Sequence, residues 1–231
     1  MISIPHVAQP NKWVEMEFVD SPFVEIVSDD FFDVKMQYPL LGMKKCEEHC
    51  LVRKEVYERL ILVRDFLPTG YKLRIWDAWR PLSLQKELFE EYSEDIVERF
   101  NLAECSEDEK HRVISKYVSL PKEDRDEPPV HTTGGAIDVT LIDEKGNELD
   151  MGTAFDSFLD STATSFYEDD SRECIITENR RVLYFAMTSA GFTNLPSEWW
   201  HYDYGDGFWA YYNRKPAMYR GCFERMELTG V

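Results

Sequence analysis

Residues 130–138 read VHTTGGAID, and this stretch decides how the chain folds around its chemistry. The diglycine at 134–135 indicates a tight turn or a close backbone approach, because glycine adopts conformations that other residues avoid. The run 136–142 then alternates, which predicts a strand with Asp138 on the face opposite its apolar stripe. A turn of this kind lets the chain fold back, so that the side chains of His131 and Asp138 point at one ion.

A second stretch, residues 197–201, reads SEWWH. Glu198 and His201 are three residues apart, so they face the same side in a turn but not in a straight strand. The segment is therefore predicted to bend near Trp199. The alternative is that the two tryptophans only pack in the core, with Glu198 and His201 at the rim. Packing of at least one tryptophan is expected in either case.

A third stretch, residues 76–81, reads WDAWRP and places Arg80 directly after a predicted strand. Ligands gather at such strand ends. The planar guanidinium of arginine also suits a carboxylate better than lysine does. The alternative is a structural ion pair with one of the 44 acidic residues.

Together these stretches provide a set of groups suited to metal-assisted hydrolysis. Two histidines and one aspartate can hold zinc while its fourth position stays open. A nearby glutamate can take a proton from water, and an arginine can bind developing negative charge. The three segments therefore predict a zinc hydrolase and, among hydrolases, a peptidase.

Composition narrows the class of protein further. The chain has 231 residues, 43% of them hydrophobic, and a formal net charge of −18. Such a surface repels phosphate backbones and anionic lipids, so neither nucleic acid nor membrane is an expected partner. The five cysteines are an odd number without a regular framework, which suits a reducing compartment. With no signal peptide recognised at the start, we expect a cytoplasmic location. The sequence predicts no oligomeric state.

The remaining pattern predicts an α+β fold. We expect one domain, residues 1–231, with a central, mainly antiparallel sheet, flanking helices and a charged, insertion-like segment at about 95–127. The periodicity of apolar residues predicts the main elements, which are a helix over 43–66, a strand over 71–76, a strand over 136–142 and a helix over 179–190.

The predicted helix over 43–66 carries Cys46, His49 and Cys50, which would share one helix face. Three soft ligands on one face can approach a metal, but a fourth ligand is missing nearby. Two partly buried thiols and a surface histidine are the favoured interpretation.

The motifs resemble those of the D-alanyl-D-alanine dipeptidases, zinc D,D-peptidases that share a fold with the signalling domain of hedgehog proteins. The resemblance rests on His131-x-x-Gly134-x-Ala136-x-Asp138 and on Glu198-Trp199-Trp200-His201. Residues 76–81, 149–156 and 179–192 are also similar to stretches of that family. The resemblance extends over about residues 34–204, which is most of the chain.

The resemblance implies a role for each matching residue. His131, Asp138 and His201 would bind one zinc ion per chain. Glu198 would act first as general base and then as acid, and Arg80 would stabilise the oxyanion. Asp156 is the candidate that holds the free ammonium of a small dipeptide substrate. The implied reaction converts D-Ala-D-Ala and water into two D-Ala.

One position departs from the family motif, which has serine where this chain has Pro129. Proline has neither a hydroxyl nor a backbone N–H, so any polar substrate contact of that serine is absent. Two alternatives therefore stay open. One is a zinc D,D-carboxypeptidase or endopeptidase acting on longer cell-wall peptides, and the other is a non-catalytic zinc-binding module. Antibiotic resistance, wall recycling and nutrition also remain open as roles of the activity.

Overall fold

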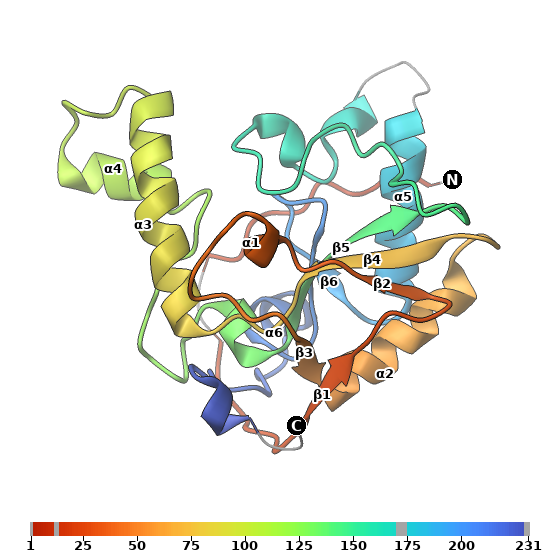
Figure 1. Ribbon diagram of the computed structural model, residues 1–231. Coiled ribbons are helices and arrows are strands. Elements are labelled where there is room, and N and C mark those ends of the chain that lie inside the picture. Colours follow the sequence, from red (N-terminus) through yellow and green to blue (C-terminus); the bar gives the residue numbers. More distant parts are fainter. Residues whose placement is uncertain (1, 12–13, 170–174, 229–231) are drawn as a thin grey trace.

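The computed structural model describes residues 2–11, 14–169 and 175–228. At its centre lies a five-stranded sheet with the order β2-β4-β5-β7-β6 (Figure 1). Only β2 runs parallel to its neighbour β4, and the other neighbours are antiparallel. The predicted α+β fold with a mainly antiparallel sheet is thereby confirmed. The strands are β2 (Phe32–Val34), β4 (Lys72–Asp77), β5 (Ala136–Ile142), β6 (Thr193–Asn194) and β7 (His201–Asp203).

Two helices, α2 (Lys54–Val63) and α5 (Ile175–Ser189), pack against one another and share the main core with the sheet. The apolar residues of β5, such as Ile137 and Val139, belong to this core, so the two helices cover that face of the sheet. The predicted helix over 179–190 is confirmed, and it begins four residues earlier than expected. Asp138 is left for the opposite face.

A helical arm extends from that second face. It consists of α3 (Leu82–Arg99) and α4 (Glu107–Ile114), which project at the left of Figure 1. A small apolar cluster of its own joins Ile96, Ile114 and Val118. The segment expected to be insertion-like, 95–127, thus begins within the last turns of α3 rather than after it. Two further helices are short, α1 (Gln37–Leu40) and α6 (Gly207–Asn213).

The helix predicted over 43–66 was wrong in its first half. Strand β3 (Cys50–Arg53) pairs antiparallel with β1 (Phe23–Ile26), and α2 starts only at Lys54. All four residues of β3 are buried, so both faces of this strand are covered by other parts of the protein. Periodicity alone does not separate such a strand from a buried helix.

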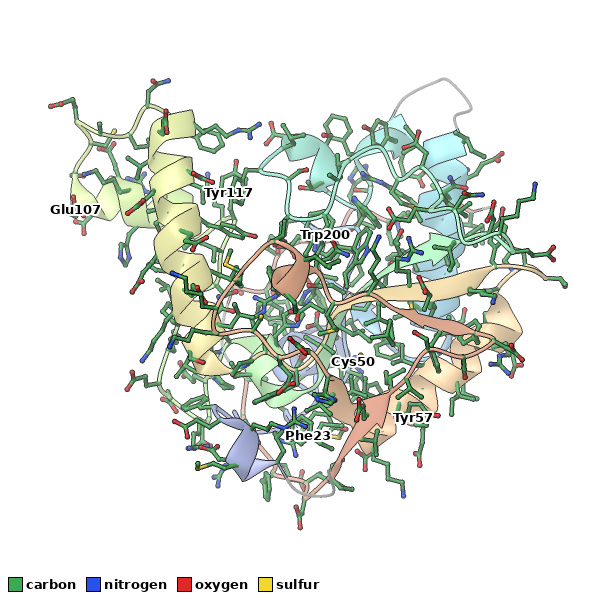
Figure 2. The ribbon with its side chains drawn as sticks, in the orientation of Figure 1. Phe23, Cys50, Tyr57, Glu107, Tyr117 and Trp200 are labelled. Carbon is green, nitrogen blue, oxygen red and sulfur yellow. The ribbon has the colours of Figure 1, made fainter. Side chains whose placement is uncertain are left out.

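This correction also separates Cys46, His49 and Cys50. The Cys46 thiol donates to the Met43 carbonyl oxygen (3.0 Å), and His49 Nδ1 lies 2.8 Å from Glu25 Oε1 at the surface. Cys50 lies in the core (Figure 2), where burial raises the pKa of its thiol above the usual range. His49 at the surface and Cys46 partly buried agree with the favoured interpretation, whereas Cys50 is fully buried and none of the three residues lies on a helix.

Within the described residues, no helix is both long and apolar enough to cross a bilayer.

Candidate metal centre and catalytic pocket

His131 is positioned by the turn that the diglycine makes possible. A 3₁₀ turn over Val130–Thr133 ends at Gly134, whose φ of 75° is left-handed. A Cβ at Gly134 would lie 2.3 Å from the Phe23 ring, and one at Gly135 would lie 2.7 Å from the Tyr204 carbonyl oxygen. Both positions therefore require glycine. The turn brings His131 beside β5.

Strand register brings the other predicted ligands together. Asp138 pairs with His201 of β7 on one side and with Asp77 of β4 on the other. Directly opposed residues on neighbouring strands point their side chains to the same face. The three polar side chains therefore form a row across the centre of the sheet, on the face away from α2 and α5.

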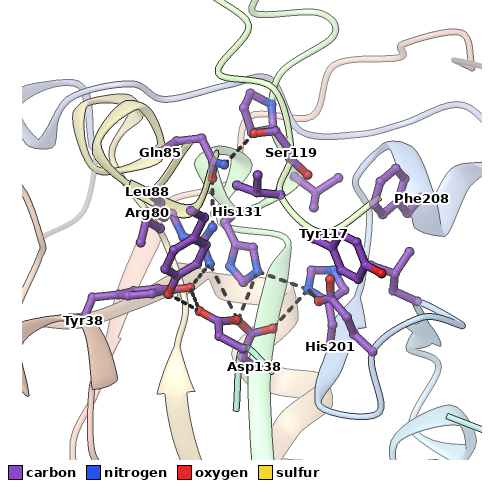
Figure 3. A pocket seen from close by; sticks show the side chains of 17 residues that line it. Tyr38, Arg80, Gln85, Leu88, Tyr117, Ser119, His131, Asp138, His201 and Phe208 are labelled. Atoms are coloured by element: carbon purple, nitrogen blue, oxygen red, sulfur yellow. Dashed lines mark hydrogen bonds and ion pairs between the residues drawn. The ribbon is translucent and has the colours of Figure 1, made fainter. Parts of the chain in front are cut away.

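The ligand atoms of His131, Asp138 and His201 surround one point (Figure 3). His131 Nε2 lies 3.1 Å from His201 Nδ1 and 3.4 Å from Asp138 Oδ2, and His201 Nδ1 lies 3.0 Å from Asp138 Oδ1. Zinc bonds of about 2.0–2.2 Å at tetrahedral angles would place ligand atoms roughly 3.3 Å apart. The spacing of the three groups fits such an ion.

The outer nitrogen of each imidazole is held by the protein. His131 Nδ1–H donates to the Ala78 carbonyl oxygen (2.8 Å), and His201 Nε2–H donates to Asp203 Oδ1 (2.8 Å). The other nitrogens, His131 Nε2 and His201 Nδ1, consequently point to the common centre. Partners of this kind fix the tautomer and the ring orientation of metal-binding histidines.

The electrostatics of the centre favour a cation. Burial opposes a charged His201 ring, but the Asp203 and Asp138 carboxylates raise its pKa well above the ordinary range. Burial opposes ionisation of Asp138 as well, but the two histidines hold its pKa well below the ordinary range. A positive charge is therefore stabilised between these groups. Two imidazoles and one carboxylate are one of the three-ligand sets that hold catalytic zinc.

Glu198 lies next to this centre. Trp199 and Trp200 are both buried, and the His201 N–H donates to the Glu198 carbonyl oxygen (3.4 Å) across the predicted bend. Glu198 Oε2 lies 3.9 Å from His201 Nδ1, and its side chain keeps 24% of its exposure. Burial, more than any other influence, raises the pKa of Glu198 to about 8. A carboxyl with such a pKa is suited to exchanging protons near neutral pH.

Arg80 follows β4 and precedes α3, as expected, and it is buried. Its Nε donates to Asp77 Oδ2 at 2.8 Å, and its Nη1 donates to Gln85 Oε1 at 2.8 Å. Its Nη2 forms an ion pair with the same Asp77 oxygen at 2.6 Å. Arg80 Nη2 also lies 3.7 Å from Asp138 Oδ2. The guanidinium is thereby held rigidly at the edge of the metal centre.

Asp156 lines the same pocket as Arg80. Its Oδ2 accepts hydrogen bonds from the hydroxyls of Tyr38 (2.9 Å) and Tyr92 (2.8 Å). Burial and the nearby Asp138 carboxylate raise the pKa of Asp156 to about 6. The pocket therefore contains three carboxylates, those of Asp138, Asp156 and Glu198, and one guanidinium.

A family model described as D-ala-D-ala dipeptidase matches residues 39–219. The chain belongs to this family. Named D-alanyl-D-alanine dipeptidases of known sequence agree with the assignment. The one from a Synechocystis species is 31% identical over 179 residues, which cover 71% of this chain and 72% of the relative. The one from Escherichia coli is 29% identical over 163 residues, 68% of each chain.

Among solved structures, the chain is similar to a vancomycin-resistance D,D-pentapeptidase from a VanB-type cassette, determined as a mutant in complex with Zn(II). The TM-score is 0.41 at 13% sequence identity, with 80% of this chain and 88% of the other covered. We base no conclusion about this chain on so loose a superposition.

Within the dipeptidase family motif, Pro129 remains a departure. It lines the pocket beside Val130, and residues 117–119, which follow α4, line the pocket too. Figure 3 shows Tyr117 and Phe208 at the side of the pocket near His201, and Ser119 next to Gln85. The Ser119 carbonyl oxygen accepts from the Gln85 side chain (2.8 Å). The segment that follows α4 therefore forms part of the pocket wall.

Sequence reasoning missed several residues of the site. Asp203 was detectable, because it lies two residues after His201 in a strand and so shares its face. Asp77 was detectable three residues before Arg80, once the strand was predicted. Tyr38, Gln85 and Tyr92 carried no signal, because only the tertiary fold brings them to the pocket.

Proposed function

We propose that the chain is a zinc-dependent dipeptidase that hydrolyses D-Ala-D-Ala to two molecules of D-Ala. The observation that carries the proposal is the triangle of ligand atoms from His131, Asp138 and His201, 3.0–3.4 Å apart, with a glutamate 3.9 Å from one of them. Membership of the dipeptidase family supports the substrate class.

His131, Asp138 and His201 would hold the ion. Zinc bound there supplies a Lewis acid and lowers the pKa of water toward neutrality. Glu198 then takes the proton of the attacking water and delivers it to the leaving amine, a role supported by its raised pKa and by its place beside the ligands. General acid–base catalysis of this kind contributes typically about 10²–10⁴-fold.

Arg80 would oppose the negative charge that grows on the carbonyl oxygen. Its hydrogen bonds to Asp77 and Gln85 orient the guanidinium before the substrate arrives, so the reaction requires no reorganisation of this group. Preorganised donors of this type are worth about 10²–10³-fold in turnover.

Asp156 would bind the free ammonium of the substrate. The partly enclosed carboxylate favours a peptide whose amino group is uncapped, and it disfavours a longer peptide that has an amide at that position. This selectivity separates the dipeptidase from the alternative of a D,D-carboxypeptidase or endopeptidase.

A panel of substrates tests the proposal. D-Ala-D-Ala, L-Ala-L-Ala and a wall pentapeptide are offered to the purified protein with zinc and after chelation. We expect hydrolysis of D-Ala-D-Ala that is lost on chelation and restored by zinc. Preference for the pentapeptide would favour the carboxypeptidase, and a zinc-loaded but inert protein would favour the binding module.

Three further expectations belong to this proposal. Residues 1–231 form one peptidase domain, with the segment at about 95–127 as an insertion. The substrate partner is a small dipeptide. The location is cytoplasmic, supported by the odd number of cysteines, and cell fractionation tests it.

A further inference from the structure

We infer that Tyr92 is a positioning residue that, together with Tyr38, holds Asp156 as the anion that receives the ammonium of the substrate. The inference rests on the proposed function for the identity of that cation. It concerns a part of the pocket that neither the metal ligands nor Glu198 and Arg80 account for.

The geometry around Asp156 is asymmetric. Both tyrosine hydroxyls donate to the same oxygen, Oδ2, at 2.9 and 2.8 Å. Among the described residues, Oδ1 has no hydrogen-bond partner, although the side chain lines the pocket. Carboxylates accept several hydrogen bonds, so the two hydroxyls fix one edge of the group and leave the other for a ligand.

The backbone at Asp156 is also constrained. Its φ of 54° is left-handed, a conformation that few residues other than glycine adopt. Aromatic contacts hold the chain on both sides, with Phe155 against Trp76 (ring centroids 5.1 Å apart) and Phe158 against Tyr92 (5.2 Å). Tyr92 therefore contacts this loop through its ring as well as through its hydroxyl.

The charges around Asp156 explain why its carboxylate needs the two tyrosine hydroxyls as hydrogen-bond donors. The charge of the Asp138 carboxylate disfavours ionisation of Asp156, and the charge of the Arg80 guanidinium favours it. Burial raises the pKa of Asp156 further, and the hydroxyls of Tyr38 and Tyr92 lower it. Hydrogen bonds to the ionised form favour that form, so the tyrosines keep the carboxyl anionic near neutral pH.

Tyr92 is the better of the two tyrosines to test. The Tyr38 hydroxyl also accepts a hydrogen bond from Arg80 Nη2 (3.0 Å), so its removal would disturb the oxyanion donor too. Among the described residues, Asp156 is the one hydrogen-bond partner of the Tyr92 hydroxyl. Burial and Asp156 raise the pKa of Tyr92 above the usual range, so this hydroxyl stays a donor.

Helix α3 links the two ends of the substrate pocket. Gln85, which orients Arg80, and Tyr92, which orients Asp156, are seven residues apart on this helix. Seven residues make nearly two turns, so both side chains lie on one face, about 10 Å apart along the axis. One rigid element therefore supports both charged anchors of the pocket.

The variant Tyr92→Phe tests the inference, with Tyr57→Phe on α2 as the control for loss of a tyrosine hydroxyl away from the pocket. We expect Tyr92→Phe to raise KM for D-Ala-D-Ala about tenfold while kcat changes less than twofold. N-acetyl-D-Ala-D-Ala lacks the ammonium, so its inhibition constant should be the same for both variants and the wild type. An unchanged KM, or equal weakening with the acetylated compound, would overturn the inference.

A second measurement tests the role of Tyr92 without an assay of turnover. The Asp156 carboxyl is titrated by ¹³C NMR in the wild type and in Tyr92→Phe, and we expect a higher pKa in the variant. The same pKa in both proteins would overturn the inference. If the wild type hydrolyses no dipeptide, the proposed function fails, but this titration still tests the role of Tyr92.

Discussion

At the scale of single residues, the site depends on partners that act behind the catalytic groups. Asp203 and the Ala78 carbonyl orient the two imidazoles, and Asp77 holds Arg80. Each of these contacts restricts the rotation of a side chain. Less conformational entropy is therefore lost when a ligand binds. The groups proposed to act on the substrate are therefore held in place by the protein itself.

The first prediction concerns Glu198. Replacing it by glutamine keeps the shape but removes the proton acceptor, so kcat for D-Ala-D-Ala should fall at least about 10²–10⁴-fold. Zinc content should stay at one ion per chain, because Glu198 is not among the three converging ligands. Elemental analysis and a turnover assay check both points. Substantial remaining turnover would exclude Glu198 as the base.

The second prediction concerns pH. The pKa of Asp156 is raised to about 6, so the carboxylate is lost as the pH falls through that value. A neutral carboxyl binds an ammonium weakly, and KM for D-Ala-D-Ala should therefore rise from about pH 7 to about pH 5. The ends of the dipeptide do not titrate in this range. In Asp156→Asn, KM should be high throughout and independent of pH, and a slope like that of the wild type would contradict the assignment.

At the scale of elements, strand register and one glycine turn assemble the candidate metal centre. β4, β5 and β7 align Asp77, Asp138 and His201 in a row, and the turn at Gly134 adds His131. The turn and β5 were predictable, because glycine and alternation are local signals. β3 was not, because its buried apolar residues fit a helix equally well.

The third prediction tests the turn. Gly134→Ala would suffer from its left-handed φ and from a Cβ 2.3 Å from the Phe23 ring. Gly146→Ala is the matched control, since its φ of 84° is also left-handed but nothing lies within 4 Å. The conformational strain is about 1–2 kcal/mol in both, and the clash adds to it only at Gly134. Urea unfolding should show the larger loss in Gly134→Ala, together with weaker zinc binding. Equal losses would contradict this role of the turn.

At the scale of the whole molecule, the pocket joins segments that are far apart in the chain. The hydrogen bonds of Asp156 reach tyrosines that are 118 and 64 residues away in sequence. Local patterns do not reveal such links, which explains why the convergence of His131, Asp138 and His201 was predictable and the two tyrosines were not. Short sequence motifs predicted the converging residues, whereas only the packed fold brings the tyrosines to the pocket.

The fourth prediction follows from this long-range closure. A metal that binds only the folded state stabilises it, by about 2.7 kcal/mol when free zinc is 100 times its Kd. For a chain of this size that corresponds to a rise in Tm of roughly 5–10 °C. Differential scanning calorimetry with and without zinc measures the shift. Asp138→Ala should show little of it, and a full shift in that variant would place the metal elsewhere.

Anomalous diffraction at the zinc edge, from crystals of the wild-type protein grown with zinc, tests the central claim most directly. We predict a single strong peak enclosed by His131 Nε2, His201 Nδ1 and the Asp138 carboxylate, with the Glu198 carboxylate beside it. A zinc peak at another set of side chains, or none between these three, would contradict the account.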